Sequence, residues 1–440
     1  MLVPRVPVQF VGWQCRQALP TRRNLAAGTR METKQISFAD LGVSGRIVSA
    51  LSERGIDEPF PIQTATIADG LAGRDVCGKA QTGSGKTLAF GIPLVERTAR
   101  AEPRYPHGLV LVPTRELCSQ VAEELTTIAD AHDLRLTAIY GGVSMGRQID
   151  AVHDGVDIVV ATPGRLIDLM ERGHVHVDAV ETVVIDEADQ MADMGFLPQV
   201  HRIMRHIEGE QQTMLFSATL DGQVGSLIRR YLTDPIRHEV ETPEGMGDDQ
   251  EHRFIEVHYR DKAKIVEAIS RSVGRTLVFV ATKRNADRVA ADLRDEGVNA
   301  EAIHGDLRQQ QREKALAGFS SGDVPVLVAT NVAARGLHID DIDIVIHYDP
   351  PADYKSFVHR SGRTARAGEE GLVVTLVEWD QRTEVKRLQA QSGLHTEITK
   401  MLSNDPRLAD LAAFQPEAVV YRKTTMADVS RRAGRRRRRR

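Results

Sequence analysis

The chain has 440 residues, of which 41% are hydrophobic and 27% are charged, and its formal net charge at pH 7 is −4. This length suffices for two domains with substantial cores, and the composition excludes fibrous and intrinsically disordered proteins. No apolar run approaches the length of a membrane span, which predicts a soluble protein without a membrane partner.

Positive charge is concentrated at the two ends of the chain. Residues 1–30 contain five arginines and no acid, and we expect a disordered extension there, with Met31 as the working start. Residues 431–440 contain eight arginines and no acid, which predicts a disordered basic tail that binds nucleic acid. The cysteines are scattered and odd in number, which indicates a reducing compartment such as the cytoplasm. They are Cys15, Cys77 and Cys118.

The first helices are predicted after Phe38. The stretch from Leu41 to Leu51 is amphipathic, and the prolines of Pro59-Phe60-Pro61 predict an extended turn before a second helix. Gln63 follows this turn. Its amide offers a donor and an acceptor, which suits the edge of an adenine, although a glutamine on a helix surface would fit the same pattern.

The segment Ala80-Gln81-Thr82-Gly83-Ser84-Gly85-Lys86-Thr87 has the spacing of a phosphate-binding loop. Closely spaced glycines let backbone N–H groups converge on phosphate oxygens. We expect Lys86 to contact the β and γ phosphates of a nucleotide and the Thr87 hydroxyl to coordinate Mg²⁺. A glycine-rich turn is the alternative, because the general motif has glycine where this chain has Ala80.

Short apolar runs then alternate with helical patterns, which predicts βα units and a parallel sheet. Each expected strand is followed at once by a polar motif, and parallel sheets bind ligands at the carboxyl ends of their strands. The motif after the third strand is Asp186-Glu187-Ala188-Asp189. It indicates the metal site of a P-loop enzyme, with an exposed acidic turn as the alternative. The expected strands are Leu109–Val112, Ile158–Ala161, Val183–Ile185 and Thr213–Phe216.

A second βα series follows a segment rich in proline, glycine and acids. We expect a linker over 241–252 between domains over 31–240 and 253–395, and a C-terminal extension over 396–440. The second series contains no phosphate-binding loop, so we expect this domain to complete a nucleotide site made by the first. Its expected strands are Leu277–Val280, Val326–Ala329, Ile344–His347 and Val373–Val377.

Arg363 and Arg366 are spaced to share one face of a helix. A solvated helix face would show the same pairing. An arginine supplied across a domain interface stabilises a transferring phosphoryl group, and this is the role that we expect of both side chains.

The loop Ala80–Thr87 and the acidic cluster Asp186–Asp189 together resemble the DEAD-box family of ATP-dependent RNA helicases, which commonly has alanine at the first loop position. The resemblance runs from about Phe38 to about Val377. It implies an α/β protein of two tandem RecA-like P-loop domains, with ATP–Mg²⁺ and single-stranded RNA bound across their cleft. It also implies that Gln63 reads adenine and that Phe38 stacks on it.

The resemblance assigns further roles. Asp186 would hold Mg²⁺ with Thr87, Glu187 would orient and deprotonate the attacking water, and Arg363 and Arg366 would stabilise the phosphoryl charge. The implied nucleotide-binding residues are Phe38, Gln63, Ala80, Gln81, Thr82, Gly83, Ser84, Gly85, Lys86 and Thr87. The implied RNA contacts, on the opposite rim, are Thr114, Arg115, Gly142, Thr162, Gly164, Arg165, Arg312 and Thr330. The implied coupling residues are Asp189, Ser217, Thr219 and His359.

Contacts to the sugar-phosphate backbone carry no sequence information. We therefore expect an RNA-dependent ATPase that binds, bends and locally unwinds RNA of any sequence or remodels RNA–protein complexes. An ATP-gated RNA clamp with slow turnover and a DNA-directed enzyme are the alternatives. The chain departs from the family's fifth motif at Asn331 and His338, where acids are usual, which weakens the expected contact of His338 with the ATP ribose.

Overall fold

The computed structural model describes residues 36–80, 83–240, 250–272, 274–334, 342–364 and 371–416. Several residues for which the sequence predicts a role lie outside this part of the chain. They are the N-terminal extension over 1–30, Gln81, Thr82, His338, Arg366 and the basic tail over 431–440. In the described part, no helix is long and apolar enough to cross a membrane.

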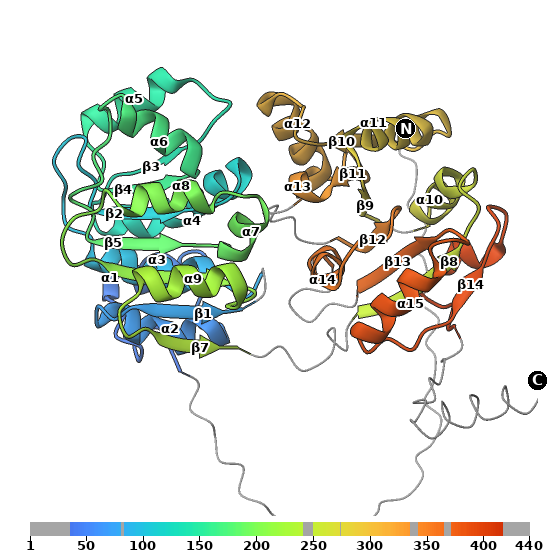
Figure 1. Ribbon diagram of the computed structural model, residues 1–440, viewed down its shortest axis with the longest axis horizontal. Coiled ribbons are helices and arrows are strands. Elements are labelled where there is room, and N and C mark those ends of the chain that lie inside the picture. Colours follow the sequence, from blue (N-terminus) through green and yellow to red (C-terminus); the bar gives the residue numbers. More distant parts are fainter. Residues whose placement is uncertain are drawn as a thin grey trace, which may run out of the picture. The chain divides into compact units, whose positions relative to one another are not determined.

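The first domain is built on a parallel sheet of seven strands in the order β3-β4-β2-β5-β6-β1-β7 (Figure 1). Its central strands are continuous apolar runs that are buried on both faces, as is usual for a parallel sheet covered by helices on each side. The strands are β1 Val76–Lys79, β2 Gly108–Leu111, β3 Leu136–Ile139, β4 Ile158–Ala161, β5 Thr182–Ile185, β6 Gln212–Ser217 and β7 Ile236–Glu239.

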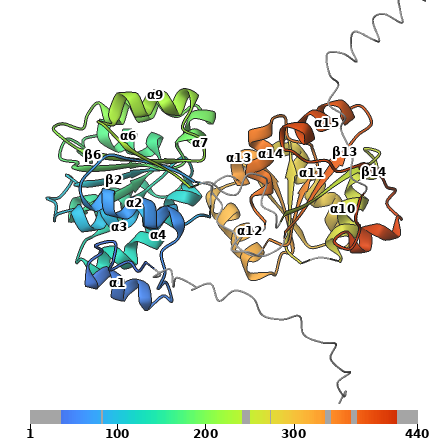
Figure 2. The same ribbon diagram turned by 90° about the horizontal axis from the view of Figure 1, so that it is seen from below.

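Helices cover both faces of this sheet (Figure 2). One core cluster packs α1 to α4 against one face, and a second packs α5 to α9 against the other. Helix α2 begins at a proline, which fits the first helical position, and α4 is capped by the Thr114 hydroxyl, which accepts from Leu117 N. The helices are α1 Gly45–Ser52, α2 Pro61–Leu71, α3 Lys86–Arg97, α4 Arg115–Ala131, α5 Met145–Asp154, α6 Pro163–Glu171, α7 Ala188–Asp193, α8 Leu197–Met204 and α9 Gly222–Tyr231.

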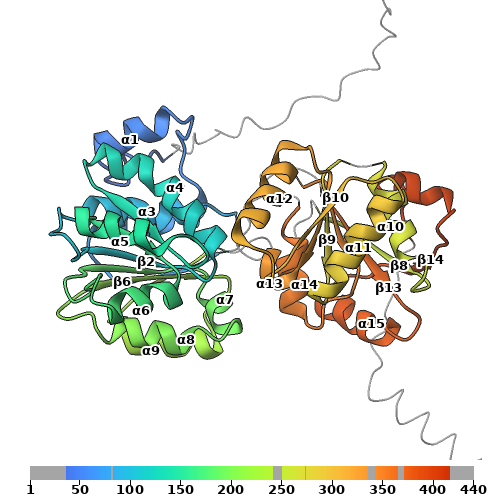
Figure 3. The same ribbon diagram turned by 90° about the horizontal axis from the view of Figure 1, so that it is seen from above.

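The second domain is built on another parallel sheet of seven strands, in the order β10-β11-β9-β12-β13-β8-β14. Helices α10 and α11 pack on one face of it, and α12 to α15 pack on the other (Figure 3). The strands are β8 Gln250–Glu256, β9 Thr276–Val280, β10 Ala300–Ile303, β11 Val326–Thr330, β12 Ile344–His347, β13 Gly371–Val377 and β14 Ile398–Lys400. The helices are α10 Lys262–Ser270, α11 Lys283–Asp295, α12 Gln309–Ser321, α13 Asn331–Ala334, α14 Tyr354–Ser361, α15 Arg382–Gln391 and the 3₁₀ helix η1 Pro406–Asp410.

The predicted α/β fold with two tandem parallel sheets is confirmed. The second domain begins earlier and ends later than expected. Strand β8 begins at Gln250, inside the expected linker, and β14 lies in the expected C-terminal extension, where Leu408 and Leu411 also join the core. Helix α14 ends at Ser361, so Arg363 follows the helix instead of lying on it.

Candidate functional site

The sheet topology divides the candidate residues into two groups along one edge. The phosphate-binding loop follows β1, the acidic cluster follows β5, and Ser217 is the last residue of β6. These three strands are neighbours in the sheet. The expected RNA contacts of the first domain follow β3, β4 and β2, which form the other half. Both groups therefore lie at the carboxyl edge of the same sheet, which differs from the opposite rims that we expected.

The phosphate-binding loop joins β1 to α3. Gly83 and Gly85 have φ angles of 90° and 82°, in the left-handed region that glycine adopts at little cost. A Cβ on Gly85 would lie 2.5 Å from Gln63 Nε2 and 2.7 Å from Phe60 Cδ2, so only glycine fits there. The loop delivers the N-terminus of a twelve-residue helix, α3, whose first residue is Lys86. This backbone fits a phosphate group.

Lys86 and Glu187 form a buried ion pair, with 2.8 Å between Nζ and Oε1 and side chains that are only 5% and 8% exposed. Burial alone would raise the pKa of Glu187, but the Lys86 ammonium lowers that pKa to about 2. Burial raises the pKa of Asp186 to about 7, against the pull of Lys86 and with the help of the Glu187 charge. Two carboxylates thus compete for one ammonium, and a further cation would relieve them.

The donors around this pair suit a hard divalent cation. Asp186 offers a carboxylate and Thr87 a hydroxyl, and oxygen ligands of this kind are preferred by Mg²⁺. The Thr87 hydroxyl also bonds to the Glu124 carboxylate, which leaves its lone pairs for a metal ion. The residues present therefore fit ATP–Mg²⁺.

Glu187 has an unusual backbone. Its φ and ψ are 50° and 48°, in the left-handed region, directly before α7. For a residue with a side chain this conformation costs about 1–3 kcal/mol and persists only where the surroundings fix it. Here the ion pair with Lys86 and the buried strand β5 fix it, and such strain is typical of functional sites.

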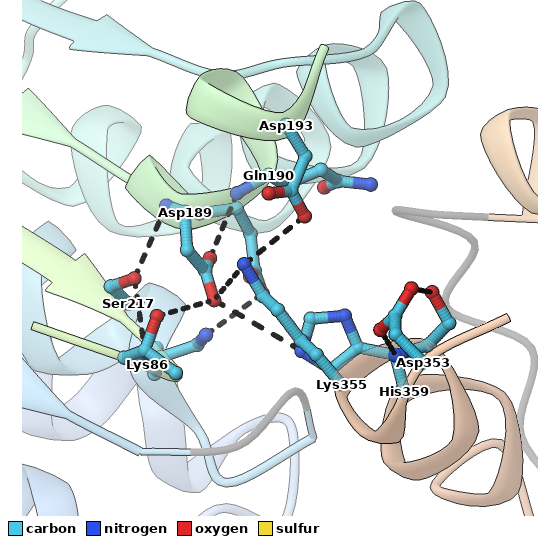
Figure 4. A network of polar contacts seen from close by, with 11 residues as sticks. Lys86, Asp189, Gln190, Asp193, Ser217, Asp353, Lys355 and His359 are labelled. Carbon is cyan, nitrogen blue, oxygen red and sulfur yellow. Dashed lines mark hydrogen bonds and ion pairs between the residues drawn. The ribbon is translucent and has the colours of Figure 1, made fainter. Parts of the chain in front are cut away.

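Three of the predicted coupling residues, Ser217, Thr219 and His359, approach the fourth, Asp189. Figure 4 shows Ser217 and His359 on two sides of the Asp189 carboxylate. Its N–H donates to Ser217 Oγ at 3.2 Å, and the Thr219 hydroxyl donates to its carboxylate at 3.4 Å. His359 Nε2, from α14 of the second domain, lies 4.0 Å from the same carboxylate. The structure thus brings all four residues together across the two domains.

Lys355 is a member of this cluster that the sequence did not suggest. Its Nζ lies 3.7 Å from Asp189 Oδ2 and 3.0 Å from Asp193 Oδ2 (Figure 4). Lys355 precedes His359 by one helical turn, and this spacing on α14 is the only signal that could have pointed to it.

The residues expected around adenine are arranged differently from the expectation. Phe38 is 2% exposed and belongs to the core beneath α1 to α4, so its ring has no free face on which a base could stack. Phe60 is 52% exposed and lies beside Gly85 of the loop. Gln63 accepts from Phe60 N at 2.8 Å and donates to Gly85 O at 2.9 Å. It thereby braces the loop and keeps one proton and one lone pair for a base.

Most of the expected RNA contacts line one cleft of about 250 Å³. Gly142 and Thr330 are not among its lining residues. Arg312 of the second domain is held in the cleft by Glu116 of the first, with 3.0 Å between Nη2 and Oε2, and sequence reasoning missed this acid. The expected contacts that line the cleft are Thr114, Arg115, Thr162, Gly164, Arg165 and Arg312.

Arg363 is 6% exposed and lines a cavity of about 450 Å³ together with Thr219 and His359. After Lys86, the Arg363 charge helps to lower the pKa of Glu187, which places Arg363 within electrostatic reach of that carboxylate. Asn331, where the family usually has an acid, accepts from Arg360 Nε at 2.6 Å. The Arg360 guanidinium therefore meets a neutral amide oxygen at this position.

Comparison with known proteins gives the same picture. A family model for the DEAD/DEAH box helicase matches residues 60–227, and one for the helicase conserved C-terminal domain matches residues 261–368. DEAD-box ATP-dependent RNA helicase 9, mitochondrial, of Arabidopsis thaliana is 41% identical over 368 residues, which are 81% of this chain and 60% of that protein. The DEAD-box ATP-dependent RNA helicase CshA of Bacillus subtilis is 38% identical over 396 residues, which are 89% of this chain and 79% of that protein.

The fold is also similar to that of solved structures. Dbp5 of S. cerevisiae bound to RNA and ADP BeF3 superposes with a TM-score of 0.75 at 28% identity, covering 84% of this chain and 96% of that one. The chain spans about three fifths of the length of the two plant relatives that match it at 41% identity. The two family models together match more than half of the chain, with CshA covered over most of its length. The chain therefore belongs to the DEAD-box family of ATP-dependent RNA helicases.

Proposed function

We propose that this protein is an RNA-dependent ATPase that uses ATP hydrolysis to bind, bend and locally unwind RNA or to remodel RNA–protein complexes. The observation that carries the proposal is the meeting at Asp189. Ser217 and Thr219 reach it from the first domain, and Lys355 and His359 reach it from the second. The Asp189 carboxylate, two residues after Glu187, can therefore make these contacts with Lys355 and His359 only when the second domain is in this position.

The ion pair between Lys86 and Glu187 suggests that the two residues act in order, first before and then after ATP binds. While Lys86 neutralises Glu187, that carboxylate is a weak base, with a pKa of about 2. When Lys86 turns to the β and γ phosphates of bound ATP, its ammonium no longer lowers the pKa of Glu187, which becomes a stronger base for the attacking water. Mg²⁺, held by Asp186 and Thr87, would neutralise charge on the phosphate oxygens. Arg363 would stabilise the charge of the transferring phosphoryl group, and Arg366 is proposed to act with it.

RNA would occupy the cleft lined by Thr114, Arg115, Gly164 and Arg312. A Cβ on Gly164 would meet nothing within 4 Å, so the N-terminus of α6 is open to a phosphate group. Contacts of this kind read the backbone and not the bases, so we propose binding without sequence preference, and ribonucleoprotein complexes as further partners.

Cys77 and Cys118 are free thiols, which supports a reducing compartment, and we propose the cytoplasm. Cell fractionation would test this location.

The function is tested by measuring ATP hydrolysis with RNA and with DNA of identical sequence. We expect RNA to stimulate turnover at least about tenfold, because 2′-hydroxyl contacts distinguish the two. Equal stimulation by DNA would support a DNA-directed enzyme. A single fast turnover followed by a long-lived RNA complex would instead support an ATP-gated clamp.

We infer that Phe60, and not Phe38, stacks on the adenine. Stacking of a base on an aromatic ring contributes about 1–3 kcal/mol, so Phe60→Ala should raise the KM for ATP about tenfold with little change in kcat. Phe38→Ala should instead create a core cavity and cost about 3–5 kcal/mol of folding free energy. The measurements are the KM of RNA-stimulated hydrolysis and the Tm of each variant. A raised KM in Phe38→Ala at unchanged Tm, with Phe60→Ala unaffected, would restore the original assignment.

A further inference from the structure

The second sheet repeats the strand order of the first, so each of its strands has a counterpart there. Strand β8 takes the place of β1, and β12 takes the place of β5. The counterpart of the phosphate-binding loop is therefore the connection from β8 to α10, residues 257–261, and the counterpart of α3 is α10.

The buried lysine of the nucleotide site is repeated at this place. Lys262 is the first residue of α10, as Lys86 is of α3, and its side chain is 2% exposed. Its Nζ lies 2.8 Å from Glu378 Oε1 and 3.7 Å from Asp349 Oδ1. Asp349 stands two residues after the end of β12, as Glu187 stands two residues after the end of β5. The second domain thus has a lysine–carboxylate pair where the first domain binds nucleotide.

This pair is not built for a second nucleotide. The connection Val257-His258-Tyr259-Arg260-Asp261 contains no glycine, so it cannot converge its N–H groups on phosphate as the first loop does. Two carboxylates already surround the Lys262 ammonium, which also lies 5.1 Å from the centroid of the Tyr348 ring. The ammonium is thus held by ion pairs and not by an aligned hydrogen bond, which indicates a structural task that depends on its charge.

Asp349 connects Lys262 to the residues that face the nucleotide. Its carboxylate accepts from Ala281 N at 2.7 Å, and its backbone carbonyl accepts from Arg360 Nη1 at 2.8 Å. Arg360 also donates to Asn331 Oδ1. It lies next to His359, which reaches Asp189, and three positions before Arg363. The position of Asp349 therefore sets where the end of α14 lies.

We propose that Lys262 is a positioning residue for the end of α14, which acts through Asp349 and Arg360 on His359 and Arg363. This inference rests on the proposed function for its catalytic readout, because it assigns Arg363 to the phosphoryl group. Without the ammonium, the carboxylates of Asp349 and Glu378 repel each other, and Asp349 moves away from the position that holds Arg360.

Lys262→Met removes the charge and keeps the apolar stem. We expect kcat of RNA-stimulated hydrolysis to fall about tenfold with the KM values for ATP and RNA within about twofold, because misplacing a catalytic group slows chemistry more than binding. Lys264→Met, an exposed lysine on the same helix, is the matched control and should leave both constants unchanged. Hydrogen exchange of residues 354–361 in the full chain should become faster in Lys262→Met than in Lys264→Met.

The exchange measurement separates this inference from the proposed function, because it needs no ATPase activity. A wild-type protein without RNA-stimulated hydrolysis would refute the proposed function and leave the exchange result to decide the role of Lys262. Unchanged exchange in α14, or equally faster exchange throughout the second sheet, would overturn the positioning role. If Lys262→Met does not fold, Asp349→Asn should lower kcat while Glu378→Gln should not. The reverse order would also overturn the inference.

Discussion

Glu187→Gln is expected to bind ATP and RNA and yet to hydrolyse ATP at least about a hundredfold more slowly than the wild type. The amide keeps the shape of the side chain but cannot accept a proton from the attacking water. It also releases Lys86 from its ion pair at 2.8 Å, so ground-state contacts of Lys86 with phosphate should be preserved or strengthened. Nucleotide binding and single-turnover hydrolysis measure the two effects separately.

Two further variants serve as comparisons for Glu187→Gln. Lys86→Ala should weaken ATP binding itself. It should also destabilise the domain, because it removes the ammonium that neutralises the buried carboxylate of Glu187. Glu171→Gln, on an exposed carboxylate that pairs with Arg202, should behave as the wild type. Near-normal hydrolysis by Glu187→Gln would remove Glu187 from the role of base.

The sequence predicted those strands whose signal lies in their own residues. Val183–Ile185 and Val326–Ala329 are continuous apolar runs, and such runs indicate a strand buried on both faces without any knowledge of the rest of the fold. The edge strands gave no such signal. β7 is Ile-Arg-His-Glu and β14 is Ile-Thr-Lys, and each becomes a strand only because a neighbouring strand offers hydrogen bonds.

The site residues also fall into those that local sequence predicts and those that only the packing of the fold determines. Glycines and acids at fixed spacing predicted the phosphate-binding loop and the acidic cluster, because those roles depend on neighbours in sequence. Whether Phe38 or Phe60 is exposed depends on packing, and the family resemblance assigned the stacking to the residue that the structure places in the core. Lys355 and Lys262 meet carboxylates more than 80 residues away in sequence, and no local pattern announces such pairs.

The contacts of Asp189 with the second domain add to the role of the acidic cluster. Asp189 was expected to join the acidic cluster to Ser217, Thr219 and His359. The structure shows that a second side chain of the same helix, Lys355, also approaches its carboxylate. Because both come from α14, any movement of that helix changes the charge around Asp189 and the place of Arg363 together. The contacts at Asp189 and the position of Arg363 thereby depend on the same helix.

Arg363→Ala should lower kcat by about a thousandfold, since arginines that stabilise a transferring phosphoryl group are worth about 10³–10⁵ in rate. The KM for ATP should change only a few-fold, because the first domain supplies most ground-state contacts. Arg363→Lys should recover only a small part of the activity, since an ammonium keeps the charge but not the planar two-pronged donor. Arg382→Ala, in the same domain and paired with Glu256 away from the nucleotide site, is the control and should be active.

The measurement is single-turnover hydrolysis at saturating RNA, with Tm recorded for each variant because Arg363 is buried. A fall in kcat at unchanged Tm assigns the loss to chemistry and not to folding. The effect should also depend on Glu187: in Glu187→Gln, where proton transfer already limits the rate, the further loss from Arg363→Ala should be smaller than in the wild type, because residues that act on one transition state are not additive. If Arg363→Ala stays within about tenfold of the wild type, the charge of the phosphoryl group is stabilised elsewhere, and Arg366 becomes the residue to test.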